Sequence, residues 1–192
     1  MPDAFGQLLD WIVRNLVIAD AEKDVDLNAS AETTADAIES NKERAAATAY
    51  DRADTLSGPF RSGLILAFEA QQKGVHEIGL DDRNPEENAI ADALIAYLVG
   101  FDLAESRSVE TQPNHYDYFV SVNWDALYRT ADSAGIDLPA ALARTATGAG
   151  LRAALGHRAD RPHRALLDHA QQLALHRQRQ VADLVEEERA AL

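Results

Sequence analysis

The sequence predicts a mainly α-helical fold, a bundle-like domain of several helices with one small β-hairpin near residues 101–124. Apolar residues make up 46% of the 192 residues and aromatic residues only 6%. An alanine-rich chain with few aromatic side chains favours helices over a sheet sandwich. Apolar side chains recur at helical spacing along most of the chain, whereas alternation with a period of two is clearest over residues 116–124.

The length and composition predict one domain over residues 1–192, because a chain of this size can bury a single sizeable core. The chain contains no cysteine, which excludes disulfides, thiolate metal sites and cysteine nucleophiles. The apolar run from Trp11 to Ala19 is interrupted by Arg14 and Asn15 and is too short to cross a bilayer. We therefore expect no membrane contact and a cytoplasmic location.

Three helices are expected in the first 74 residues. The first spans residues 3–22, with Asp3 as its N-cap, and the polar residues 23–30 predict a turn. A second helix begins near Ser30. The stretch Ser57-Gly58-Pro59 predicts a break, after which a third helix runs from about residue 60 until Gly74 ends it.

The second of these helices carries an inward stripe that is rich in alanine and is interrupted by Lys42 and Arg52. Such a stripe buries little area per residue. In the preferred interpretation the stripe covers one side of a helical bundle within the chain. The alternative is that it forms the interface of a homodimer. The stripe consists of Ala31, Ala35, Ile38, Ala45, Ala49 and Leu56.

The middle of the chain predicts a buried helix followed by a hairpin. Residues 86–99 contain no Lys or Arg, and the helix should be almost fully buried in its central turns. Strands are expected over 101–111 and 116–124, joined at Pro113-Asn114-His115. The order of helices and hairpin is also that of a winged helix. A DNA-reading helix needs side chains that contact phosphates and bases, so a standard winged helix is not expected.

Helices account for most of the remaining chain. One is expected over residues 125–134, with Asp125 as N-cap and Gly135 after its end, and another over 137–147. A short helix near 151–155 and a final helix from about residue 160 complete a total of roughly seven.

Charge is distributed unevenly along the chain, whose formal net charge is −14. Residues 1–143 form an acidic core segment with a net charge of −16, whereas residues 144–180 carry seven Arg and two Asp, a net charge of +5. The last stretch, residues 181–192, has a net charge of −3. Together the two stretches form a C-terminal helical segment, residues 144–192, that is basic compared with the acidic core segment. Abundant carboxylates with only three lysines are typical of proteins from salt-adapted, halophilic organisms, in which salt screens self-repulsion.

We expect a non-enzymatic interaction or regulatory protein that contacts an anionic partner, either nucleic acid or an acidic protein, through residues 144–180. Arginine binds phosphate and carboxylate groups with paired hydrogen bonds. An alternative is that this stretch packs on the acidic surface of the same chain or of a dimer mate. The candidate binding residues are Arg144, Arg152, Arg158, Arg161, Arg164, Arg177 and Arg179.

Residues 152–169 contain three consecutive copies of the pattern Arg-Ala-x-x-x-His. A step of six residues turns a helical side chain by about 240°, so the copies cannot form one stripe. His169 and His176 share a helix face but lie about 10 Å apart along the axis, too far for one ion. No nucleophile elbow, phosphate loop or dinucleotide fingerprint occurs. The sequence therefore predicts neither a metal site nor a cofactor.

The third copy, Arg164-Ala-Leu-Leu-Asp-His169, resembles the R-x(4–6)-H signature of HEPN-domain ribonucleases. The resemblance covers six residues, and Ala165 stands where that family usually has a polar residue. It implies a metal-independent ribonuclease in which His169 acts as general acid or base on a ribose hydroxyl and Arg164 holds the phosphate. This is the alternative function.

Overall fold

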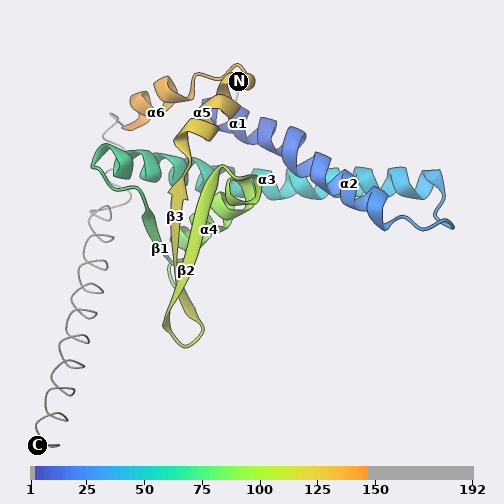
Figure 1. Ribbon diagram of the computed structural model, residues 1–192, viewed down its shortest axis with the longest axis horizontal. Coiled ribbons are helices and arrows are strands. Elements are labelled where there is room, and N and C mark those ends of the chain that lie inside the picture. Colours follow the sequence, from blue (N-terminus) through green and yellow to red (C-terminus); the bar gives the residue numbers. More distant parts are fainter. Residues whose placement is uncertain (1–2, 147–192) are drawn as a thin grey trace, which may run out of the picture. The chain divides into compact units, whose positions relative to one another are not determined.

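Helices and one small antiparallel sheet make up residues 3–146, the part of the chain that the computed structural model describes (Figure 1). This confirms the predicted mainly α-helical class with a small β element. The helices are α1 (Ala4–Ile12), which continues through a π-helical segment (Val13–Val17) into α2 (Ile18–Asn28), α3 (Ala35–Gln72), α4 (Pro85–Tyr97), α5 (Trp124–Ser133) and α6 (Leu138–Ala146). The strands are β1 (Ile78–Asp81), β2 (Ala104–Gln112) and β3 (His115–Val122).

The first helical run is longer than predicted. Asp3 is the N-cap, as expected, and its side chain accepts a hydrogen bond of 2.9 Å from the backbone N–H of Gly6. The expected turn over residues 23–30 is wrong, because α2 continues to Asn28. Lys42 of α3 forms an ion pair of 2.7 Å with Asp26. This ion pair is one of the contacts through which α2 packs on α3, and the composition of the polar stretch alone did not predict that packing.

The helix α3 is one continuous element, so the break predicted at Ser57-Gly58-Pro59 is wrong. A proline inside a helix removes one backbone hydrogen bond and also crowds the preceding residue. Gly58 has no Cβ to crowd, which lowers this cost. Phe60 and Leu64, just beyond the proline, are fully buried. Their packing holds the second half of α3 in line with the first.

The alanine-rich stripe of α3 faces α2. Figure 1 shows α2 and the first half of α3 running side by side. Ile38, Ala45 and Ala49 are half-buried, and Lys42 on the same face reaches Asp26 of α2. The stripe therefore lies within an intramolecular helix pair, as the preferred interpretation predicts, although two of its expected members, Ala31 and Ala35, are exposed.

The sheet has three strands in the order β1-β3-β2, all antiparallel, and the sequence predicted only two of them. The hairpin is confirmed, and Asn114 turns the chain with a φ of 63°. The sequence does not predict β1, whose four residues are too few to show an alternation with a period of two. The predicted second strand also ended too late, since Asn123 caps α5 in place of Asp125.

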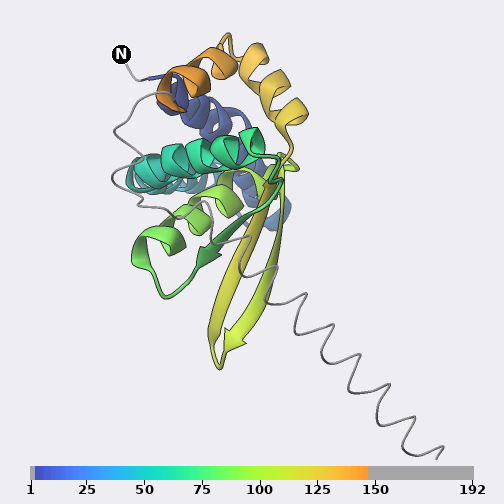
Figure 2. The same cartoon turned by 90° about the vertical axis from the view of Figure 1, so that its left-hand side faces the viewer.

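The helix α4 lies between α3 and the sheet (Figure 2). A Cβ atom on Gly63 of α3 would come within 2.9 Å of the Leu94 side chain, so the two helices touch closely. Nearby, the rings of Phe60 and Tyr97 meet edge to face at 6.1 Å. Ile90 of α4 and Val120 of β3 are both buried. The prediction that the central turns of α4 are buried is confirmed.

The last two described helices close the core. Gly135, with a φ of +71°, ends α5 at the predicted place, and Asp137 accepts a hydrogen bond of 3.0 Å from Ala140 at the start of α6. Leu138 and Leu142 of α6 are fully buried. No helix within residues 3–146 is long and apolar enough to cross a membrane.

Two substitutions in α3 should change stability in opposite directions. Pro59→Ala restores a helical N–H donor and should raise the free energy of unfolding by about 1–3 kcal/mol. Gly63→Ala adds a Cβ against Leu94 and should lower it by about 1–3 kcal/mol. Chemical denaturation followed by circular dichroism measures both. A destabilised Pro59→Ala variant would show that the proline ring itself is required at this point of α3.

Candidate functional site

The predicted binding arginines fall almost entirely outside the described residues. Arg144 is the exception, and it lies exposed in the last turn of α6. His169, the residue of the alternative nuclease function, also lies outside the described part. The remaining predicted site residues outside it are Arg152, Arg158, Arg161, Arg164, Arg177 and Arg179. Their roles stay predictions from the sequence.

A cluster of four carboxylates, Asp81, Asp82, Glu87 and Asp117, lies where β1 leads into α4. We call it the β1 carboxylate cluster. Three of its members come from the short stretch 81–87, and the fourth comes from β3. Titratable groups that are brought together in this way are the first place to look for shifted protonation and chemistry.

The buried member of the cluster, Glu87, has a structural role. Asn84 caps α4 by accepting a hydrogen bond of 3.1 Å from the backbone N–H of Glu86. Glu87 accepts hydrogen bonds from the Asn84 side chain at 3.1 Å and from the backbone N–H of Asp81 at 2.9 Å. The Glu87 carboxylate, only 7% exposed, thereby closes the turn from β1 into α4.

Two further members hold the surrounding strands and turn. Arg83 donates to both carboxylate oxygens of Asp81, at 2.9 and 2.8 Å. Asp82 accepts a hydrogen bond of 2.8 Å from the backbone N–H of Tyr116, and its other oxygen lies 3.4 Å from His115 Nδ1. These contacts connect the β1–α4 turn to the start of β3.

The fourth member, Asp117, is held least well. It lies directly opposite Asp81 in the β1–β3 register, and like charges in directly opposed positions destabilise a sheet. Burial raises the pKa of Asp117 above its usual range, and the charge of Asp81 raises it further. No described residue donates a hydrogen bond to its Oδ1 atom. Asp117 is therefore the carboxylate of this cluster that should bind a proton more readily in the folded protein than in the unfolded chain.

The cluster does not provide a metal site. Within residues 3–146 no group of three or more acidic or histidine side chains is arranged to hold an ion. Glu87, Asp81 and Asp82 point instead at backbone N–H groups, Arg83 and His115. The cluster can store charge repulsion and take up a proton, and its described contacts support the turn.

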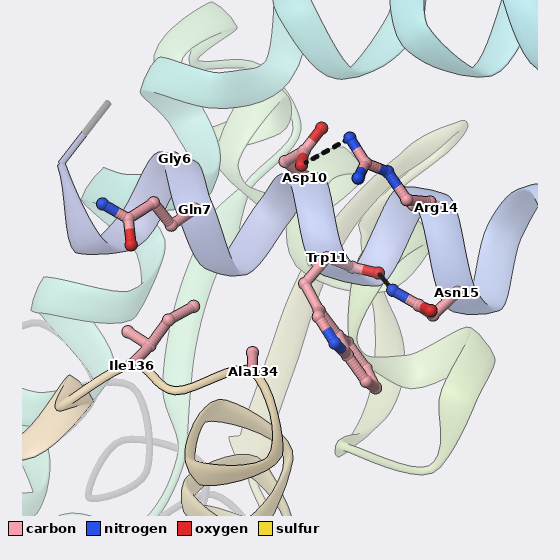
Figure 3. A pocket seen from close by; sticks show the side chains of 8 residues that line it. All are labelled: Gly6, Gln7, Asp10, Trp11, Arg14, Asn15, Ala134 and Ile136. Atoms are coloured by element: carbon pink, nitrogen blue, oxygen red, sulfur yellow. Dashed lines mark hydrogen bonds and ion pairs between the residues drawn. The ribbon is translucent and has the colours of Figure 1, made fainter. Parts of the chain in front are cut away.

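A hollow of about 420 Å³ lies between α1 and the connection from α5 to α6 (Figure 3). The Trp11 indole and Ile136 supply its apolar surface. At its rim Arg14 forms an ion pair of 3.2 Å with Asp10, and a hydrogen bond to Tyr50, followed by the Asp10 charge, raises the pKa of Arg14. The lining residues are Gly6, Gln7, Asp10, Trp11, Arg14, Asn15, Ala134 and Ile136.

This hollow offers contacts and no catalytic arrangement. The Asn15 amide donates one hydrogen bond of 2.9 Å to the backbone oxygen of Trp11, one helical turn before it. The Asp10 and Arg14 side chains pair with each other, at 51% and 65% exposure. No nucleophile and adjacent base occur among its lining residues.

Sequence reasoning missed the residues of both features. The spacing of Asn84 and Glu87 matches that of a helix capping box, which is a readable signal. The approach of Asp81 to Asp117 depends on the strand register, which no local pattern specifies. The hollow likewise depends on how the α5–α6 connection packs on α1.

Comparison of the chain with known protein families, with curated proteins and with solved structures found no match.

Replacing Asp117 with Asn should stabilise the protein at neutral pH by roughly 0.2–1 kcal/mol, because it removes the charge opposite Asp81. The folded state raises the pKa of Asp117, so the wild type gains stability as pH falls through that pKa. The advantage of the variant should therefore shrink between pH 7 and about pH 4. Urea denaturation across this range measures it, with exposed Asp92→Asn as the control, and an advantage that grows towards acid would contradict the assignment.

Proposed function

We propose that the protein is a non-enzymatic interaction protein whose Arg-rich segment 144–180 contacts an anionic partner. The observation that carries the proposal is the inversion of charge along the chain. Residues 1–143 carry ten Lys and Arg against 26 Asp and Glu, a net charge of −16. Segment 144–180 carries seven Arg and two Asp. An anion approaching the chain is repelled by the first part and attracted by the second.

Carboxylates of the same part of the chain already pair with several of its cations. Of the ten Lys and Arg side chains in residues 3–143, five form such ion pairs, which favours leaving the contact to segment 144–180. These pairs are Arg14–Asp10, Lys42–Asp26, Arg61–Asp3, Arg83–Asp81 and Arg107–Glu77.

The composition of segment 144–180 favours phosphate as the anion. Its cations are all arginine, whose planar guanidinium donates two parallel hydrogen bonds to a phosphate or carboxylate. The segment contains no Phe, Tyr or Trp, the side chains on which the bases of a single strand stack most strongly. These features together favour contacts with the backbone of a nucleic acid duplex, and an acidic protein is the competing partner in the test.

Reversing Arg158, Arg161 and Arg164 to Glu should weaken binding to a fluorescent DNA duplex by tenfold or more at about 0.1 M salt. The slope of log affinity against log salt should fall by up to about 3, one for each lost phosphate contact. Fluorescence anisotropy measures both quantities, and poly-glutamate replaces DNA in a parallel titration. Tighter binding to poly-glutamate would assign the segment to acidic proteins.

A matched control makes the same change of charge in the described domain. Arg44, Arg52 and Arg129 are exposed and are reversed to Glu in one variant. This control should lose little affinity if segment 144–180 makes the contact. Equal losses in both triple variants would mean that only net charge matters, and the proposed segment would then be wrong.

The alternative function is a HEPN-like ribonuclease, favoured by the pattern Arg164-Ala-Leu-Leu-Asp-His169. Such an enzyme should cleave single-stranded RNA in the presence of EDTA, since its chemistry would use a histidine and an arginine. His169→Ala should abolish cleavage and leave RNA binding within about twofold. Cleavage that persists in His169→Ala, or no cleavage by the wild type, would exclude this alternative.

A further inference from the structure

Histidine is concentrated in the same stretch of the chain as the surplus of arginine. Segment 144–180 holds four of the six histidines of the chain, and three of them directly precede an arginine. The fourth, His169, follows Asp168. Neutral histidine adds no formal charge, so the charge inversion behind the proposed function does not depend on these residues. The three pairs are His157-Arg158, His163-Arg164 and His176-Arg177.

The two histidines of the described part of the chain stand beside carboxylates. The Nδ1 atom of His115 lies 3.4 Å from a carboxylate oxygen of Asp82. His76 directly precedes Glu77 in the chain. A proton bound by either histidine is balanced by a neighbouring negative charge, in a stretch, residues 1–143, with 26 Asp and Glu against ten Lys and Arg. Protonation there therefore creates no surplus of positive charge for an anion.

The histidines of segment 144–180 have few carboxylates near them in the sequence. Seven arginines of the segment stand against only Asp160 and Asp168. Histidine is the side chain that changes its charge between about pH 5 and pH 8. Because each protonated histidine adds one positive charge, protonation of all four raises the formal net charge of the segment from +5 to +9. The attraction of the segment for an anion should therefore grow in mild acid.

The arginine beside each of three histidines couples this protonation to anion binding. A positive charge next to a histidine disfavours its protonated form, whereas a bound phosphate favours it. A phosphate held by Arg158 thus raises the pKa of His157 above its value in the free chain. Linkage is reciprocal, so a proton on His157 strengthens the binding of that phosphate by the same factor. The affinity rises as pH falls through the raised pKa.

We propose that segment 144–180 takes up protons when it binds its anionic partner, so that its affinity rises between about pH 7.5 and about pH 5.5. This inference rests on the proposed function and names how that same contact is regulated. The ligand class remains the phosphate backbone of a nucleic acid duplex, whose charge does not change in this range.

Protonation elsewhere in the chain acts differently on such a complex. In acid, His76, His115 and Asp117 of the described part also gain protons, which lowers the general repulsion of an anion. A protonated histidine of the segment instead makes a direct contact with a phosphate and releases a counterion. Each such contact steepens the slope of log affinity against log salt by about 0.9. The salt slope therefore separates the two effects.

Fluorescence anisotropy of the full chain with a DNA duplex measures the response at about pH 7.5 and about pH 5.5, in about 0.1 M salt. The wild type should bind at least about tenfold more tightly at the lower pH. That is the contribution of one histidine whose pKa the bound phosphate raises by about one. The slope of log affinity against log salt should steepen by at least about 1 over the same change.

Three variants assign the response to the histidines of the segment. Glutamine at all four positions should reduce the ratio of the two affinities to below about twofold, because no proton can then be added there. Arginine at all four positions should give, at pH 7.5, at least the wild-type affinity of pH 5.5. The control variant, His76→Gln with His115→Gln, should keep the full response. Circular dichroism at both pH values checks that every variant is folded. The four positions are His157, His163, His169 and His176.

The outcomes distinguish this inference from the proposed function. Equal affinity of the wild type at both pH values, or a response that persists in the glutamine variant, would overturn the proton linkage and leave the proposed function standing. A response that disappears in the control variant would assign it to the described part of the chain, and the inference would then be wrong. If the wild type binds the duplex at neither pH, both the inference and the proposed contact with a nucleic acid are wrong.

Discussion

Leu94 of α4 lies directly over Gly63 of α3, and this contact sets where the other described elements can be. A glycine at a helix crossing lets two backbones approach more closely than any side chain would permit. The approach places α4 between α3 and the sheet. Glu87, at the start of α4, then binds the backbone of β1 through Asp81. A single small residue thus positions the strand that the β1 carboxylate cluster is built on.

The sequence predicts helix ends well where local chemistry determines them. Asp3 caps α1, and the left-handed glycines Gly74 and Gly135 stand just beyond α3 and α5. It fails where distant contacts decide. Residues 23–28 are helical beside Lys42, and α3 passes through Pro59 because the residues after it are buried. Contacts between segments that are far apart in sequence outweigh propensity at these two places.

The candidate functional features differ in how far the sequence reveals them. The charge of segment 144–180 is readable directly, because formal charges add along a chain whatever its fold. The proximity of Asp81 to Asp117 follows from strand register, which depends on the missed strand β1. The hollow beside Trp11 needs two helices and a connection to be placed together. The sequence therefore reveals the charge of each segment, whereas the contacts between residues far apart in the chain appear only in the structure.

The helix α3 has a consequence for the dynamics of the protein. From Phe60 onward its large side chains enter the main core, whereas its first half packs mainly against α2 with mostly half-buried alanines between them. Paired helices with so little apolar contact open at a lower free energy than core helices do. Amide protons of residues 35–52 should thus exchange with solvent through local opening, and those beyond Phe60 only through global unfolding. One uninterrupted helix spans two cooperative units, and Pro59 stands at their boundary.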